Sequence, residues 1–585
     1  MNILQKKSNK RGGRHSSKKQ VILFLLVLFF IYNIVAIFFV AVGISRVNSF
    51  ANDAKVQAEQ FAFEEAEQSI LESGSSLHFA QIGMDLLFWI KPIPYIGDQV
   101  SGLSLLFHAG ESSTQALSQV LTIARSISEV IFDKGDEIPS NGSQFIYDDL
   151  STEVKVNLLR KLYQSVGALR EAKVELSFVQ DDLIKMDKMK LLPQFKAITS
   201  PLAVWLPDLI GGIDVLIPFA QSIDELAGLS GARQWLVLFM NDMELRPGGG
   251  FVGVYGLVTV ENGSITNISI EDTYAVDSLV EKNDLYTLLA PIPLERYMGE
   301  DKWYLRDSNW SPDFSQSARD ATMILNREFS SLNKPSPQID GVIALSPTFG
   351  ESMLSLLGDI EIYDTVYNSE NLSELLEFEV EFGYKERGVD FSERKEVVGL
   401  LAEEVIERLL NMDILSFAKA FSLFDKGFQE KQIVLYSFDD SVQNVLQNAN
   451  WGGVVESDAV DSLLVADANL DSLKSDPAVK RSINYSIAPK GDEFNAKVEI
   501  TYNHIGEYDD FTTRYQTYTR VYAPLGSSLI KVEGAEEETN IDVADDLGMT
   551  SFGALFIIKP GEIKTVTYEY ELSEEVANSI DNGIY

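Results

Sequence analysis

The chain has 585 residues, which leaves room for roughly three or four domains. It carries 87 acidic and 48 basic residues, a formal net charge of −39, and so acidic a chain repels nucleic acid unless a divalent cation or a local basic pocket intervenes. The absence of cysteine excludes disulfides, thiolate catalysis and cysteine-ligated metals.

A transmembrane helix is predicted from Val21 to Ile44. These 24 residues contain no charge and one side-chain amide, Asn33. The segment is long enough to span a bilayer and longer than the apolar region of a usual signal peptide. The tail at 1–20 contains seven basic residues and no acid, so the positive-inside rule places it in the cytoplasm. We therefore expect a single-pass cell-membrane protein with an extracytoplasmic body.

Residues 45–230 have mostly helical patterns and predict a helical stalk or bundle. The apolar segment from Phe79 to Ile90 ends at a Lys-Pro-Ile-Pro break, and a turn-rich link is expected at 133–143. Most apolar positions here fit helix-to-helix packing. The stretch Met84–Ile90, with its Phe and Trp, would alternatively suit a position against the bilayer.

Residues 231–478 predict an α/β domain in which helices cover a central sheet, because short apolar runs alternate with helical patterns. From 479 to 575 the pattern contains strands only and predicts a β-sandwich, followed by a tail at 576–585. The acidic stretch Glu536–Glu538 with Asp542–Asp546 is expected to be a solvated loop. The fold class is therefore multidomain α+β. The expected strands are 235–240, 251–260, 339–345, 360–363, 432–437, 461–465, 496–502, 513–522, 554–558 and 563–572, and the expected helices are 315–329, 347–357 and 391–410.

A glycine-rich turn between the first two strands of the α/β region is the strongest candidate for a binding site. Arg246 is followed by Pro247 and by three glycines at 248–250. Glycine permits positive φ and close approach of the backbone to a ligand, and arginine offers a fixed fork of donors that suits phosphate or carboxylate. The alternative is a turn arginine that pairs with Glu244 or Asp242 and packs its stem.

A second candidate site comprises Asp307, Asn309 and Asp313. Their side-chain oxygens are of the kind that hold a divalent cation. The alternative is that these residues form turns and the N-cap of the helix expected at 315–329.

Four motifs together resemble a bacterial family of uncharacterised membrane-anchored proteins, the domain of unknown function 4012 family. The motifs are NDMELRPGGGF, RDSNWSPDF (Arg306–Phe314), IDGVIAL and LLVADANLDSLKSD (Leu463–Asp476). The resemblance runs from about Ile213 to the C-terminus, and it implies no established reaction.

The order of elements is also similar to the LytR–CpsA–Psr family. Its members transfer glycopolymers from a polyprenyl-pyrophosphate carrier to the cell wall, using arginines, an aspartate and Mg²⁺. This resemblance implies a pyrophosphate clamp and a Mg²⁺ site. The residues that fall at the corresponding positions are Arg246, Arg387 and Arg394 for the clamp, and Asp272 and Asp390 for the metal.

Two functions follow from these patterns. The first is an envelope protein of unknown activity that binds an envelope glycan, a polyprenyl- or otherwise lipid-linked ligand, or a protein partner. The second is a Mg²⁺-dependent transferase of glycopolymers from a polyprenyl-pyrophosphate carrier. Glu271 stands where the transferases have an arginine, and Pro247-Gly248 replace their Ser-Asp. Because fewer charges then remain to hold pyrophosphate and metal, the sequence favours the first function.

Overall fold

The computed structural model describes most of the chain, and the expected link at 133–143 and much of the basic tail lie outside the described residues. The structure is of mixed α and β type and divides into two compact units, Met1–Phe145 with Val156–Ala220 and Ile146–Lys155 with Gln221–Tyr585. The described residues are 14–60, 62–131, 146–412, 414–457, 461–491, 493–536 and 539–581.

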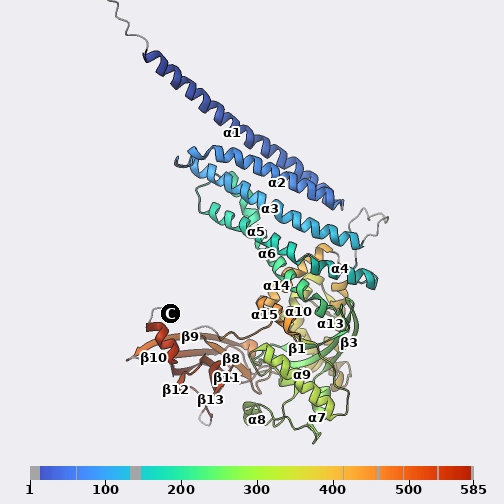
Figure 1. The fold of residues 1–585 in the computed structure, drawn as a ribbon. Helices are drawn as coiled ribbons and strands as arrows, with labels where there is room; N and C mark the ends of the chain where they lie inside the picture. Colours follow the sequence, from blue (N-terminus) through green and yellow to red (C-terminus); the bar gives the residue numbers. More distant parts are fainter. Residues whose placement is uncertain are drawn as a thin grey trace, which may run out of the picture. The chain divides into compact units, whose positions relative to one another are not determined.

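The first unit is helical, as the sequence predicts (Figure 1). The predicted span lies within one unbroken helix, α1, that continues to Glu59. α1 and α6 are each long and apolar enough to cross a membrane, judged by length and composition alone. Part of α6 is a core helix, because Leu206 and Ile213 are buried against α3 and α5. The helices are α1 (Arg14–Glu59), α2 (Phe63–Leu86), η1 (Phe88–Ile90), α3 (Ile96–Ile131), α4 (Thr152–Gln164), α5 (Val166–Asp187) and α6 (Pro193–Leu226).

The second unit contains a five-stranded sheet with the strand order β3-β2-β1-β4-β7. β1 and β4 pair in parallel, and the other neighbours pair antiparallel. The strands expected at 235–240, 251–260, 339–345 and 432–437 are all present. The bounds are β1 (Arg233–Asn241), β2 (Phe251–Glu261), β3 (Ser264–Asp272), β4 (Gly341–Leu345) and β7 (Ile433–Ser437).

Helices cover both faces of this sheet, as expected (Figure 1). α9 contacts β4 and β7, whereas α10 contacts β1 and α13 contacts β3. The helix expected at 391–410 begins only at Glu396, because a separate 3₁₀ turn, η4, precedes it. The remaining elements of this region are α7 (Tyr274–Glu281), α8 (Ile292–Met298), η2 (Leu305–Asp307), α9 (Phe314–Ser331), α10 (Pro347–Leu357), β5 (Ile360–Ile362), β6 (Thr365–Tyr367), α11 (Leu372–Phe378), η3 (Glu379–Gly383), α12 (Tyr384–Glu386), η4 (Phe391–Glu393), α13 (Glu396–Leu410), α14 (Ile414–Gln429) and α15 (Asp440–Asn448).

Two four-stranded sheets follow, with the orders β12-β15-β10-β9 and β13-β14-β11-β8. Their inner faces share one core that contains Phe552, Phe556 and Tyr568. This arrangement agrees with the sandwich that the alternating pattern predicts. The bounds are β8 (Leu464–Asn469), η5 (Asp476–Ala478), β9 (Val479–Lys490), β10 (Glu493–His504), β11 (Tyr515–Pro524), β12 (Ser528–Glu533), β13 (Asp542–Asp546), β14 (Met549–Ile558), β15 (Ile563–Glu571) and α16 (Glu574–Asp581).

Three expectations for this region are wrong. The strand expected at 461–465 forms at 464–469, and it pairs with β11 of the sandwich instead of joining the α/β sheet. Asp542–Asp546 is a strand and not a loop: it pairs with β14, and Asp542 accepts hydrogen bonds from Arg296 and Tyr518. Residues 576–581, expected to form a tail, belong to the helix α16. Val576 of this helix is buried in the sandwich core.

Candidate functional site

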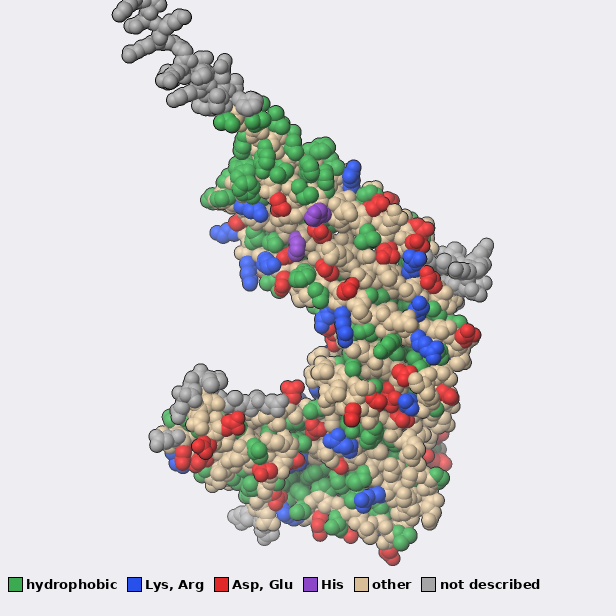
Figure 2. All heavy atoms as spheres, viewed as in Figure 1, with side chains coloured by type: hydrophobic (Ala, Val, Ile, Leu, Met, Phe, Trp, Pro, Cys, Tyr) green, Lys and Arg blue, Asp and Glu red, His purple; other side chains and the backbone are tan. Residues whose placement is uncertain are grey.

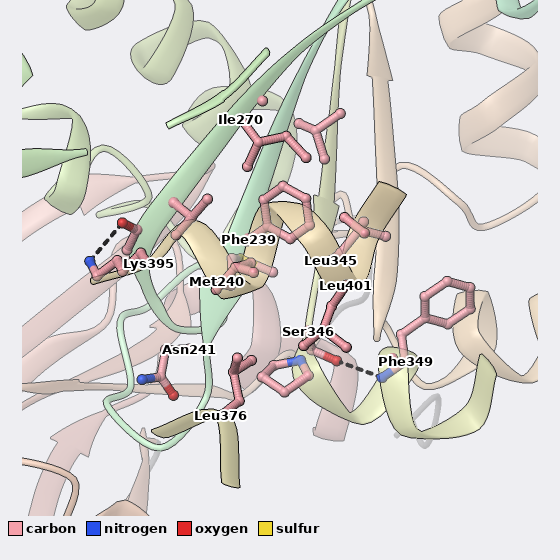
Figure 3. Close-up of a pocket in the computed structure, with 18 of the residues that line it drawn as sticks. Phe239, Met240, Asn241, Ile270, Leu345, Ser346, Phe349, Leu376, Lys395 and Leu401 are labelled. Carbon is pink, nitrogen blue, oxygen red and sulfur yellow. Dashed lines mark hydrogen bonds between the residues drawn. The ribbon is translucent and has the colours of Figure 1, made fainter. Parts of the chain in front are cut away.

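A cavity of about 750 Å³ lies between the five-stranded sheet and the helices α10, α11, α13 and α14. Its volume is within the range of sites for small molecules. Figure 3 shows the side chains of Phe239, Ile270 and Leu401 around this space, with Lys395 and Asn241 at one end of it. The walls are mostly apolar, and the charged groups gather at that end.

The strands form the cavity wall because alternate side chains point to opposite faces of a sheet. On β1, Leu236 and Leu238 are buried in the core beside α9, whereas Val237 and Phe239 line the cavity. β4 repeats the pattern. The face of β1 and β4 towards α9 is therefore filled, and their other face borders a cavity beneath the helices.

Two glycines of β2 enlarge the cavity. Gly253 and Gly256 line it at positions where a strand usually carries a large side chain. A Cβ built at Gly256 would make only ordinary contacts, 3.5 Å from Ile270 and Val237. Packing therefore does not require glycine at 256, and such a glycine in a strand is typical of sites that another group approaches closely.

The opposite wall is the apolar face of α13. Leu401, Ala402, Val405 and Leu409 line the cavity at helical spacing of three and four residues. The next residue after Ala402, Glu403, is exposed and lies outside the lining. α13 is thus amphipathic, and its apolar stripe faces an open space for part of its length.

The charged end of the cavity contains three cations and the four carboxylates that pair with them, of which Asp272 lies just outside the lining; a further carboxylate, Asp510, also lines the cavity. Lys474 donates to Glu244 at 3.0 Å and lies 3.5 Å from Glu377. The side chain of Glu381 is one-third exposed, so this end reaches solvent. The full set, which we call the charged end, is Arg394, Lys395, Lys474, Glu244, Asp272, Glu377 and Glu381.

Burial and pairing set the pKa values of these groups. Burial lowers the pKa of Lys395, and the nearby Asp272 offsets only part of that effect. Burial also favours the neutral form of Glu244, but the charges of Lys474 and Arg246 outweigh it and lower the pKa of this carboxyl. For Lys474, burial is outweighed by Glu244 and its pKa is raised. Glu244 and Lys474 are therefore held as an ion pair.

Arg246 lies beside the charged end but does not line the cavity. It is 2 % exposed, and all three guanidinium nitrogens donate to protein acceptors. Nε donates to Asp307 at 2.7 Å, Nη1 to the carbonyl of Asn469 at 2.7 Å, and Nη2 to Glu244 at 3.2 Å. The structure therefore shows the alternative considered from the sequence, a turn arginine paired with Glu244, and a ligand role for Arg246 stays an untested prediction.

The glycines after Arg246 have a structural reason that the sequence did not reveal. A Cβ at Gly250 would lie 2.3 Å from the carbonyl oxygen of Asn241, and a Cβ at Gly248 would lie 2.9 Å from that of Asn309. Gly249 has φ +133°, which side chains disfavour. The close approach that we expected from a ligand comes from the chain itself.

The other two arginines predicted for the clamp lie in different places. Arg394 lines the cavity, donates to Glu381 at 3.3 Å and lies 3.8 Å from Asp272. Arg387 instead pairs with Glu379 at 2.7 Å and covers the ring of Tyr363. Asp390 lies in the turn before η4, where its carbonyl accepts from the backbone of Glu393. The structure therefore brings Arg394 and Asp272 together and leaves Arg387 outside the cavity lining.

The three residues of the second candidate have protein partners. Asp307 accepts from Arg246, and Asn309 donates to the carbonyl of Gly250 at 2.6 Å. Asp313 is the N-cap of α9, as the alternative proposed. Among the described residues, no group of three or more carboxylates and histidines is placed to hold a metal ion. A metal role for Asp307, Asn309, Asp313, Asp272 or Asp390 stays a prediction.

Sequence reasoning missed the two lysines of the charged end. Lys395 donates to the carbonyl of Gly253 at 2.8 Å and to Asp272 at 3.0 Å. It directly follows Arg394, and Lys474 lies inside the quoted LLVADANLDSLKSD motif. These positions in the sequence were the available signal, but only the fold shows that both lysines line one cavity, Lys395 buried and Lys474 partly buried.

Comparisons with known proteins place part of this region in a family. Residues 230–380 match the model of the family described as "Protein of unknown function (DUF4012)". The match confirms, for these residues, the family that the motifs resembled. It covers β1, β2, β3 and α10 but ends before Arg394, Lys395 and Lys474. No curated protein and no solved structure matches the chain, so the resemblance to the LytR–CpsA–Psr family gains no support from these comparisons.

Proposed function

We propose that this protein is a membrane-anchored envelope protein whose second unit binds a lipid-linked ligand. The hydrocarbon chain of the ligand lies in the cavity and its polar head lies at the charged end. The observation that carries the proposal is the cavity itself: a large space with apolar walls on one face of a sheet whose other face is filled. Of the three ligand classes considered from the sequence, only a lipid-linked one uses both parts of this site.

The apolar walls supply the affinity. Each CH₂ group that moves from water into such a space contributes about 0.8 kcal/mol, which is about a fourfold change in Kd. A ligand whose chain fits within the cavity should therefore bind more tightly with each added carbon, until the space is filled.

The charged end constrains the head group. Its three cations face four carboxylates, and each cation already has a carboxylate partner. A head with several negative charges would have to displace these carboxylates, which is unfavourable in a partly buried site. A head of low net charge with hydrogen-bonding groups, such as a sugar, fits better.

The placement of the body outside the cell is part of the same proposal. It is supported by the basic residues before the apolar segment of α1, by the length of that segment and by the acidic composition of the rest of the chain.

The test is to identify what the full-length chain retains when it is extracted from membranes in polymer-bounded discs. Ala402→Trp fills the cavity from α13, and Glu403→Trp adds the same side chain to the exposed face of the same helix. Mass spectrometry should find one lipid class enriched over bulk membrane lipid in the wild type and in Glu403→Trp, and lost in Ala402→Trp. Equal lipid content in all three proteins would refute the proposal.

A second candidate is the Mg²⁺-dependent transferase, favoured by the proximity of Arg394 and Asp272 at the cavity. In that case Lys395 would have to leave Asp272 for the metal to bind. Incubation of the full chain with a polyprenyl-pyrophosphate-linked glycan, Mg²⁺ and a cell-wall glycan should then transfer the glycan phosphate to an acceptor hydroxyl and release polyprenyl phosphate, and Asp272→Asn should abolish both. Lipid binding without release would leave the binding function alone.

A further inference from the structure

The turn between α2 and α3 lies beside the predicted membrane span. The ring of Trp89 in this turn is 4.9 Å from the ring of Phe29 in α1. One helical turn further along α1, the hydroxyl of Tyr32 donates to the carbonyl of Leu86 at 2.5 Å. α2 therefore runs back along α1, and its C-terminal end meets α1 within the apolar segment.

Small residues fix this antiparallel arrangement. A Cβ at Gly83 of α2 would lie 2.7 Å from the carbonyl of Ala36, and a Cβ at Gly43 of α1 would lie 2.6 Å from the Cβ of Ala80. Such positions allow helices to approach closely, which is the usual basis of helix packing in membranes. These two close approaches place the C-terminal part of α2 against Ala36 and Gly43 of α1, with the turn beyond it.

The length of the span then decides where the turn lies. A bilayer needs about 20 helical residues, and 17 at the least. A span that ended at the level of the turn would contain only Val21–Tyr32, about 12 residues. Because that is too short, the acyl region must extend past Tyr32 and so past the level of the turn.

The surface of the turn is suited to lipid. Phe88, Tyr95 and Ile96 are 64, 57 and 51 % exposed. Figure 2 shows hydrophobic side chains gathered over the described apolar part of α1 and the neighbouring end of the α2–α3 hairpin. Lys91, also exposed, has a side chain long enough to reach the head groups. Trp89 and Tyr95 of the turn are of the residue types enriched where a membrane meets water.

We propose that the α2–α3 turn, Leu87–Ile96, inserts into the same bilayer that α1 crosses, as a re-entrant hairpin tip. The chain then has two membrane contacts, one span and one inserted turn, which hold the helical unit against the bilayer. The inference rests on the proposed anchoring by α1.

The absence of native cysteine allows a clean test, in which single cysteines carry an environment-sensitive NBD dye. The full chain is reconstituted into phosphatidylcholine–phosphatidylglycerol vesicles with or without doxyl-labelled lipid. Phe88→Cys reports the turn, and Leu71→Cys is the matched control on α2, at a residue that is also apolar and 50 % exposed. Phe30→Cys, at a residue 72 % exposed, reports the span.

The proposal predicts severalfold stronger quenching by doxyl lipid at positions 30 and 88 than at 71. Quenching at 30 with no more at 88 than at 71 would overturn the inserted turn and leave the span intact. A blue-shifted signal at 88 that doxyl lipid does not quench would show that protein covers the turn. This result would also overturn the proposal that the turn is inserted. No quenching at 30 would overturn the anchoring together with this inference.

Discussion

The two faces of the five-stranded sheet differ in how completely they are filled. Towards α9, Leu236, Leu238 and Val342 are fully buried, and the small residues Ala318 and Ala321 let the helix approach closely. Towards α13, the same strands border a space of about 750 Å³. Strands that are apolar on both faces are usually taken as doubly buried core. Here one face is filled and contributes stability, and the other borders an open space, which we propose holds a ligand.

The largest difference is expected between two buried arginines. Arg246→Ala removes the 2.7 Å cation partner of the buried Asp307, while Glu244 keeps Lys474, and should lower the free energy of unfolding by about 3–5 kcal/mol. Arg394→Ala should cost only about 1 kcal/mol, because Asp272 keeps its bond to Lys395. Hydrogen exchange at the amides of β1 measures both effects as opening free energies. If Arg246→Ala leaves exchange unchanged, the structural role assigned to this arginine is wrong.

Matched leucines compare the two faces directly. Leu238→Ala on the filled face should cost about 3 kcal/mol, since it creates a new cavity. Leu345→Ala on the other face should cost about 1 kcal/mol, since that side chain already borders empty space. Hydrogen exchange at the amides of β1 and β4 measures both losses as opening free energies. Equal losses would show that the second face is packed as tightly as the first.

Enlarged side chains should show the same contrast, with the larger loss of stability again on the filled face. Ala321→Trp overpacks the contact between α9 and the sheet and should destabilise by about 1–3 kcal/mol or more. Ala402→Trp places the same ring in the cavity and should change stability by less than about 1 kcal/mol. Thermal unfolding in lipid discs compares the variants. A strongly destabilised Ala402→Trp would contradict an open space beside α13.

A smaller effect is expected from a buried acid pair on the filled side. Burial raises the pKa values of Glu328 and Asp277, and the charge of Asp277 raises that of Glu328 further. The folded protein then holds a proton that the unfolded chain releases above the ordinary carboxyl pKa of about 4. Stability should therefore fall as pH rises from there through neutrality.

Glu328→Gln tests this dependence, because the amide cannot titrate. The variant should gain stability over the wild type as pH rises from 5 to 8, by about 1.4 kcal/mol for each pH unit in which only the folded wild type holds the proton. Unfolding midpoints at the two pH values give the comparison, with Glu403→Gln on the exposed face of α13 as the control. Parallel curves for wild type and Glu328→Gln would mean that the pair holds no extra proton.

The sequence predicted the elements with strong local patterns. β1, β2, β4, α9 and α10 all lie where periodicity and turn residues put them, because each pattern is complete within its own segment. β8 was assigned to the wrong sheet because a six-residue strand does not encode its partner. β13 was missed because DVADD has the composition of a loop, and its pairing depends on distant groups such as Arg296.

The candidate site was predicted only in part, for the same reason. Arg246 was singled out, but its main partner, Asp307, lies 61 residues away along the chain. The cavity is a property of the space between β1, β3 and α13, and no single segment carries it. The charged end likewise depends on Lys474 approaching Glu244 from 230 residues away.

The most direct test of the lipid cavity is photocrosslinking in a membrane. The full chain is placed in lipid discs that contain a lipid with a diazirine at the end of its chain, and the crosslinked peptides are mapped by mass spectrometry. The account predicts adducts on α13, lost in Ala402→Trp and kept in Glu403→Trp, in addition to those on α1. Adducts confined to α1 and the other membrane-facing helices, with none on α13 in any variant, would contradict it.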